Sequence, residues 1–258
     1  MKTISKMILG AACLTGLMGM TGAALAQGAD WELSGYAAVT SDYKFRGISQ
    51  GDRDPSPQGS LNLTGPDGWY IGTWLSSVNF TGPGGTNPYL EMDIYGGKHF
   101  DLGGFADLNV QAYYYSYPAA DLPAGAPDLS YFEGIAQLSK TFDALTVTAT
   151  WAYSPELTAG GGTGNYLGGN ATYVINDWLS LSGNVGHQWA QNAKYAGSRD
   201  YTHYDIGASL SYMGFVLDGR WNSTDLNAAQ CGAFYMATVD ACKGSFVASL
   251  TYNFKLLP

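Results

Sequence analysis

Six charged side chains fall on the polar rows of strand-like segments, where they would face a common interior. In a narrow passage with walls of low dielectric constant, a ring of carboxylates attracts cations and repels anions. Acids outnumber bases in this set, so a modest cation preference is predicted. The alternative is that Glu91, Asp93 and Arg220 pair across the interior and brace the fold. The six residues are Glu91, Asp93, Glu133, Asp205, Asp218 and Arg220.

Catalytic chemistry is the competing interpretation, because a hydrolase needs a base beside a nucleophile. The chain has three histidines, and His203 lies two positions from both Tyr201 and Asp205. On one face of a strand these neighbours would be about 7 Å apart. Serine and aspartate are abundant here, so such a coincidence is easy. No catalytic residue is therefore predicted, and no cofactor is implied.

Arg46, beside Asp42 and Lys44, is a further candidate for binding anionic groups. An arginine binds phosphates and carboxylates bidentately, so it could guard the mouth of a passage. It could equally hold a strand end at the level of lipid headgroups. We favour the headgroup anchor.

Two cysteines, Cys231 and Cys242, lie in the longest connection of the chain. Their placement in an exported protein predicts a disulfide that closes the ten-residue loop from Gly232 to Ala241. Two free thiols are the alternative. A metal site is disfavoured because that loop contains no histidine.

The elements that must position these residues are about a dozen segments of alternating apolar and polar residues. Five short and six long connections join them, which predicts twelve strands. This asymmetry is typical of an up-and-down transmembrane β-barrel with tight periplasmic turns and longer outer loops. The long connections are expected near 46–59, 80–88, 118–129, 154–165, 191–200 and 223–244.

Periodicity alone also fits a soluble sandwich or a lipocalin-like barrel, whose apolar rows would face inward. The polar rows of this chain are rich in Ser, Thr, Asn, Gly and Gln. A soluble surface usually carries about 25–35% charged residues, whereas the whole chain has 13%. This favours the membrane barrel, with Tyr and Trp girdles at its two interfaces. In the segment from Trp69 to Asn79, the pattern does not decide which of the two alternating rows of side chains faces lipid.

Residues 1–26 predict a cleaved secretory signal peptide. Lys2 and Lys6 precede the apolar stretch Met7 to Met20, and Ala24-Leu25-Ala26 is an A-x-A cleavage site. Cleavage leaves ten Lys and Arg against 21 Asp and Glu. Nucleic acid is excluded as a partner by this negative charge. Residues 27–258 are predicted to form one barrel domain.

The segment Ser41-Asp42-Tyr43-Lys44-Phe45-Arg46-Gly47-Ile48-Ser49-Gln50 resembles the N-terminal signature of the TorF family of bacterial porins. Two other pieces fit the same pattern: the run from Leu90 to Gly97, and the cysteine-containing loop followed by a strand ending at Phe254. The resemblance implies an outer-membrane barrel that conducts small solutes. One departure is that Lys255-Leu256-Leu257-Pro258 follows the terminal Phe254.

These observations predict an outer-membrane porin through which small hydrophilic solutes diffuse passively. Its expected partners are outer-membrane lipid, small polar solutes and, during biogenesis, the barrel assembly machinery. The alternatives are an outer-membrane barrel enzyme of the protease or lipase type, or a structural or adhesive surface protein.

Overall fold

The computed structural model describes residues 31–81, 85–191, 199–233 and 238–257. Twelve antiparallel strands close into one barrel in the order β1-β14-β13-β12-β11-β10-β9-β8-β7-β6-β5-β4, which confirms the predicted fold. The predicted signal peptide, residues 1–26, lies outside the described residues. The strands are β1 (Glu32–Thr40), β4 (Ser56–Thr64), β5 (Trp69–Ser77), β6 (Leu90–Asp101), β7 (Asp107–Ser116), β8 (Tyr131–Phe142), β9 (Leu145–Ser154), β10 (Thr163–Asn176), β11 (Leu179–Gln191), β12 (Tyr201–Tyr212), β13 (Phe215–Thr224) and β14 (Ser245–Leu257).

The barrel carries its large apolar side chains on the outside. On β13, Phe215, Leu217 and Trp221 are exposed, whereas Asp218 and Arg220 between them are buried. This is the reverse of a soluble barrel, because the apolar row faces lipid and the polar row faces the interior. No helix in the described parts of the chain is long and apolar enough to cross a bilayer.

Strand β5 resolves the ambiguity in its alternation. Tyr70 and Trp74 point inward and are buried, while Trp69 and Ile71 are exposed. The indole Nε1 of Trp74 donates a hydrogen bond to Tyr36 Oη at 2.7 Å inside the barrel. A buried indole needs such an acceptor, and the interior of the barrel supplies it.

Strand β4 is longer than its sequence suggests. The sequence indicates a short strand from Ser60 to Thr64 after a loop extending to 59, but β4 begins at Ser56. Pro57 and Gly59 are the residues that conceal it, since both are uncommon inside strands. The pairing with β1 nevertheless continues through Val39 opposite Pro57 and Ala37 opposite Gly59.

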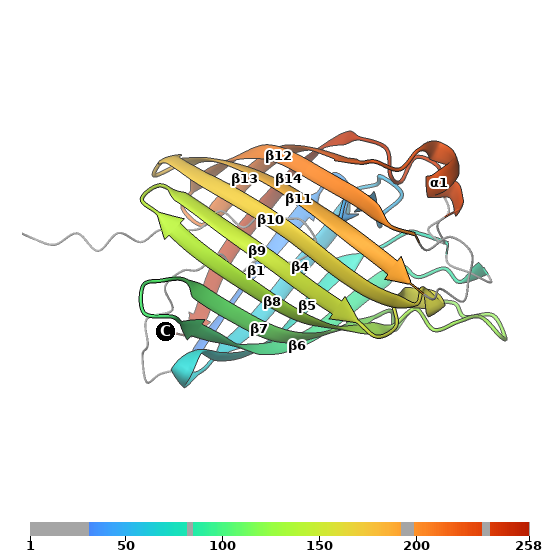
Figure 1. Cartoon of the computed structure of the whole chain (residues 1–258), viewed down its shortest axis with the longest axis horizontal. Helices are drawn as coiled ribbons and strands as arrows, with labels where there is room; N and C mark the ends of the chain where they lie inside the picture. Colours follow the sequence, from blue (N-terminus) through green and yellow to red (C-terminus); the bar gives the residue numbers. More distant parts are fainter. Residues whose placement is uncertain (1–30, 82–84, 192–198, 234–237, 258) are drawn as a thin grey trace, which may run out of the picture.

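Short turns and long loops lie at opposite ends of the barrel, and helix α1 (Ala228–Ala233) belongs to the loop end (Figure 1). The turn between β12 and β13 consists of Met213 and Gly214, with φ of 48° and 86°. Two positive φ values are what a two-residue type I′ turn requires. Strands β1 and β14 close the barrel, and the residues after Phe254 extend β14 as far as Leu257, opposite Leu33.

Candidate functional site

The segment after β1 folds into the barrel instead of staying at its rim. Residues 44–45 (β2, Lys44–Phe45) and 48–49 (β3, Ile48–Ser49) pair as a small hairpin, which we call the inner hairpin. Arg46 and Gly47 form its turn, with φ of 46° and 82°. A Cβ at Gly47 would lie 2.7 Å from His203 Cβ, so a glycine is needed for this close approach to the wall.

The expectation that Arg46 anchors the strand end at the headgroups is wrong. Its side chain is 2% exposed and lies inside the barrel. Its Nη1 and Nη2 donate to the two carboxylate oxygens of Glu133 at 3.0 and 2.8 Å, and Nη1 also donates to Gln188. The guanidinium lies 4.2 Å from the ring centroid of Tyr166. A fully desolvated guanidinium requires a charged partner, and the carboxylate of Glu133 supplies it bidentately inside the barrel.

The disulfide-linked loop covers the inner hairpin. Cys231 and Cys242 are bonded, as predicted. The carbonyl of Ala241 accepts hydrogen bonds from Lys44 Nζ at 3.2 Å and from the Ser49 amide at 2.9 Å. Burial lowers the pKa of Lys44, and the nearby carboxylate of Asp42, 2.9 Å from Nζ, opposes that shift. The signature segment and the cysteine loop are thus one packed unit.

Glu91 and Asp93 form an acidic pair on the inner face of β6. Tyr43 donates to Glu91 Oε1 at 3.2 Å, and Tyr113 donates to Asp93 Oδ2 at 3.1 Å. Tyr117 also hydrogen-bonds the carboxylate of Glu91, and the backbone of Ser116 hydrogen-bonds that of Asp93. No ion pair is found between either acid and a described basic side chain.

A second charged group surrounds Arg220 on β13. Its Nη1 donates to Asp205 Oδ1 and its Nε to Asp218 Oδ1, both at 2.7 Å. Ser209 adds a hydrogen bond to Asp218 Oδ2 at 2.6 Å. All six sequence-predicted charges therefore lie inside the barrel, in three groups: Glu133 with Arg46, Glu91 with Asp93, and Asp205 and Asp218 with Arg220. Their role in ion selectivity stays a prediction.

A stack of tyrosines inside the barrel was missed by sequence reasoning, which assigned the tyrosines to girdles. The rings of Tyr95 and Tyr113 stack at 4.9 Å, and those of Tyr115 and Tyr131 stack at 4.3 Å. The run of tyrosines on β7 contained the signal. Strict alternation sends Tyr113 and Tyr115 inward and leaves Tyr114 exposed.

His203 and Asp205, the neighbours considered for catalytic chemistry, each have another partner inside the barrel. His203 Nε2 lies 3.0 Å from Tyr166 Oη, and the two rings stack at 5.7 Å. The carboxylate of Asp205 is bound by Arg220. Within the described residues, no cluster of three or more potential metal ligands is found.

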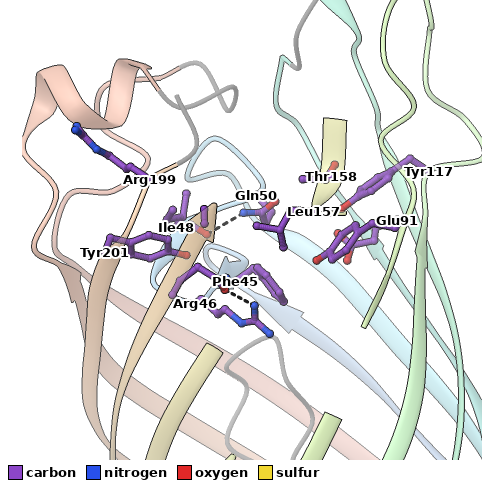
Figure 2. Close-up of a pocket in the computed structure, with 13 residues that line it drawn as sticks. Phe45, Arg46, Ile48, Gln50, Glu91, Tyr117, Leu157, Thr158, Arg199 and Tyr201 are labelled. Atoms are coloured by element: carbon purple, nitrogen blue, oxygen red, sulfur yellow. Dashed lines mark hydrogen bonds between the residues drawn. The ribbon is translucent and has the colours of Figure 1, made fainter. Parts of the chain in front are cut away.

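One cavity of about 50 Å³ lies between the inner hairpin and the surrounding wall. Figure 2 shows Glu91 and Tyr117 on one side of it and Tyr201 and Arg199 on the other, with Phe45 and Arg46 between them. The hairpin and the side chains around it thus narrow the interior at this level.

A family model described as "Bacterial protein of unknown function (Gcw_chp)" matches residues 24–254. No curated protein matches the sequence. Solved structures of porins match the fold at low identity, among them the following two. The KdgM porin in complex with disordered oligogalacturonate has a TM-score of 0.54 and 6% identity, covering 86% of this chain and 99% of that chain. The NanC porin has a TM-score of 0.53 and 11% identity, covering 87% and 100%.

Proposed function

The chain belongs to the Gcw_chp family, whose description names no activity, and we propose that it is an outer-membrane channel for passive diffusion of small hydrophilic solutes. This proposal rests mainly on one observation: the barrel is closed, with an apolar exterior and a charged, polar interior. An interior row of Ser, Thr, Gln, Asp and Arg serves water and solutes, whereas a purely structural barrel could fill its interior with apolar side chains. The fold shared with KdgM and NanC supports this proposal.

The proposal includes a mild preference for cations. The described buried residues include six acids and three bases. The acids are Asp42, Glu91, Asp93, Glu133, Asp205 and Asp218, and the bases are Lys44, Arg46 and Arg220. Each base has an acidic partner. Three acids are in excess: Glu91 and Asp93, which have no basic partner among the described residues, and one of the two acids bound by Arg220. In a channel with low-dielectric walls that excess raises the local cation concentration.

The inner hairpin and the outer loops narrow the route. Thr158 Oγ1 donates to the carbonyl of Leu129 at 2.6 Å, which joins the loop after β9 to the loop after β7. Thr224 Oγ1 donates to the carbonyl of Cys242 at 3.0 Å on the far side of the hairpin. Solutes would have to pass beside this assembly, so the passage suits small molecules.

We also propose four further features that the sequence predicts. These are the assignment to TorF-type porins, export directed by residues 1–26, a barrel domain from 27 to 258, and insertion by the barrel assembly machinery. An outer-membrane channel needs the last three, because its strands must cross the periplasm before they close in lipid.

Planar-bilayer recording tests the proposal. The purified barrel should produce discrete conductance steps, and a tenfold KCl gradient should give a reversal potential of the sign expected for cation preference. Glu91→Gln should move that potential toward zero, whereas Glu32→Gln, at the first residue of β1 and paired with the exposed Lys255, should change it less. Absence of any conductance would overturn the channel, and an anion-favouring potential would overturn the selectivity.

A further inference from the structure

The outward rows of the described barrel strands carry no Asp, Glu or Arg and only two lysines. Lys98 lies on the outer face of β6 with Phe100, and Lys140 lies on the outer face of β8 with Phe142. Both lysines lie close to the strand ends that lead into short turns, and β7 separates the two strands. A lysine on a lipid-facing row is costly at the bilayer midplane but costs little near the membrane surface. Their shared position at one end of the barrel therefore points to the membrane surface.

Two aromatic rings flank Lys98. Its Nζ lies 4.9 Å from the ring centroid of Trp69 and 5.3 Å from that of Phe100. Trp69 is directly opposite Lys98 in the strand register and is 58% exposed. The rings attract the ammonium but leave its charge uncompensated. Lys98 forms no ion pair with an acidic side chain in the described parts of the chain.

Lys140 has similar surroundings on the other side of β7. Its Nζ lies 6.0 Å from the ring centroids of both Phe105 and Phe142, which are exposed. It also donates a hydrogen bond to the carbonyl of Gly104 in the short turn between β6 and β7. Among the described residues it too has no acidic partner, whereas Lys255 at the same end of the barrel has one. Each outward lysine thus presents an ammonium without a carboxylate, beside exposed rings.

The two lysines are too far apart to share one phosphate group. Lys98 is opposite Val110 on β7, and Val110 is opposite Ala136 on β8. Two strand spacings, together with the length of strand from Ala136 to Lys140, separate the two backbones by about 16 Å. Each ammonium would therefore meet a headgroup of its own.

We infer that the outer face of β5 to β8 binds anionic phospholipid of the periplasmic leaflet, with one lipid phosphate at Lys98 and another at Lys140. The short turns identify this end of the barrel as periplasmic. A phosphate supplies the missing negative charge, and the exposed rings lie where headgroups meet hydrocarbon, in contact with the acyl chains. The inference concerns the outer surface and holds whether or not the barrel conducts.

Native mass spectrometry tests this inference on the folded barrel, released from neutral detergent micelles that contain equal amounts of phosphatidylglycerol and phosphatidylcholine. The unchanged protein should retain about fivefold more phosphatidylglycerol, the preference that a lysine near an anionic membrane surface supports. The double variant Lys98→Gln and Lys140→Gln should retain the two lipids equally, and each single variant should show an intermediate preference. Lys255→Gln removes a base with an acidic partner at the same end and should keep the full preference.

Heat-modifiable gel mobility should show that each variant folds. The double variant Lys98→Arg and Lys140→Arg keeps both charges and should keep the preference for phosphatidylglycerol. Equal retention of the two lipids by the unchanged protein, or an undiminished preference in the double glutamine variant, would overturn the inference. Lipopolysaccharide in place of phosphatidylglycerol should bind the unchanged protein and the double glutamine variant alike. Its selective loss from that variant would assign the lysines to the outer leaflet and would also overturn the inference.

Discussion

Two arginines are buried inside this barrel, and they reach their partners in different ways. Arg220 is paired within the wall, with Asp218 two residues away and Asp205 fifteen residues away on the neighbouring strand β12. Arg46 is carried on the inner hairpin and pairs with Glu133 and Gln188, which are 87 and 142 residues away on β8 and β11. Strand register alone can assemble the first group, whereas the second exists only when the barrel is closed.

This difference suggests different roles for the two arginines. Arg220 binds two acids, Asp205 and Asp218, that β12 and β13 bring together when they pair. Arg46 joins the inner hairpin to β8 and β11, two wall strands that are separated by β9 and β10. Loss of Arg220 should therefore harm the wall itself, and loss of Arg46 should mainly release the hairpin.

Arg220→Met should have the largest effect. It leaves both Asp205 and Asp218 as buried acids without a compensating charge, and breaking a buried pair in this way costs about 3–5 kcal/mol. Urea unfolding followed by gel mobility should show a large fall in the midpoint or failure to fold. Arg220→Lys, which keeps the charge, should recover part of the loss. An unchanged midpoint for Arg220→Met would contradict the structural role assigned to this group.

Arg46→Met should destabilise the barrel less than Arg220→Met, because the hairpin can leave the interior and allow water to reach Glu133. Single-channel conductance should rise by about twofold or more as the constriction opens. Adding Glu133→Gln should recover part of the stability loss, since residues in direct contact show coupling energies of about 0.5–3 kcal/mol. Conductance that stays constant in Arg46→Met would show that the hairpin does not limit the passage.

Lys255→Gln should have the smallest effect. Lys255 Nζ lies 2.7 Å from Glu32 Oε2 across the closing strands β14 and β1, but its side chain is 67% exposed. Exposed ion pairs contribute about 0–1 kcal/mol because water and salt screen them. The urea midpoint should stay close to that of the unchanged protein. If the midpoint fell as far as in Arg46→Met, the position of an ion pair between β1 and β14, and not its burial, would determine how much it contributes to stability.

The alternation of apolar and polar residues predicted which side chains of most strands face outward and which face inward, because this pattern is contained within each strand. Asp218 and Arg220 alternate with Leu217 and Trp221, and the structure places the two pairs on opposite sides. The same reasoning did not decide which face of β5 points inward, because Tyr70 and Trp74 are about as hydrophobic as Trp69 and Ile71. Hydrogen bonds to residues on other strands decide that case, and a local pattern does not contain them.

The sequence by itself determined the number of strands, the separation of short turns from long loops, and the pairing of Cys231 with Cys242. These follow from local periodicity, turn residues and cysteine count, all of which are readable over short distances along the chain. The tertiary structure decided that residues 41–50 fold inward, that Arg46 meets Glu133, and that Glu91 and Arg46 share one pocket. Such contacts join residues that become neighbours only when β1 and β14 close the barrel, so no local pattern specifies them.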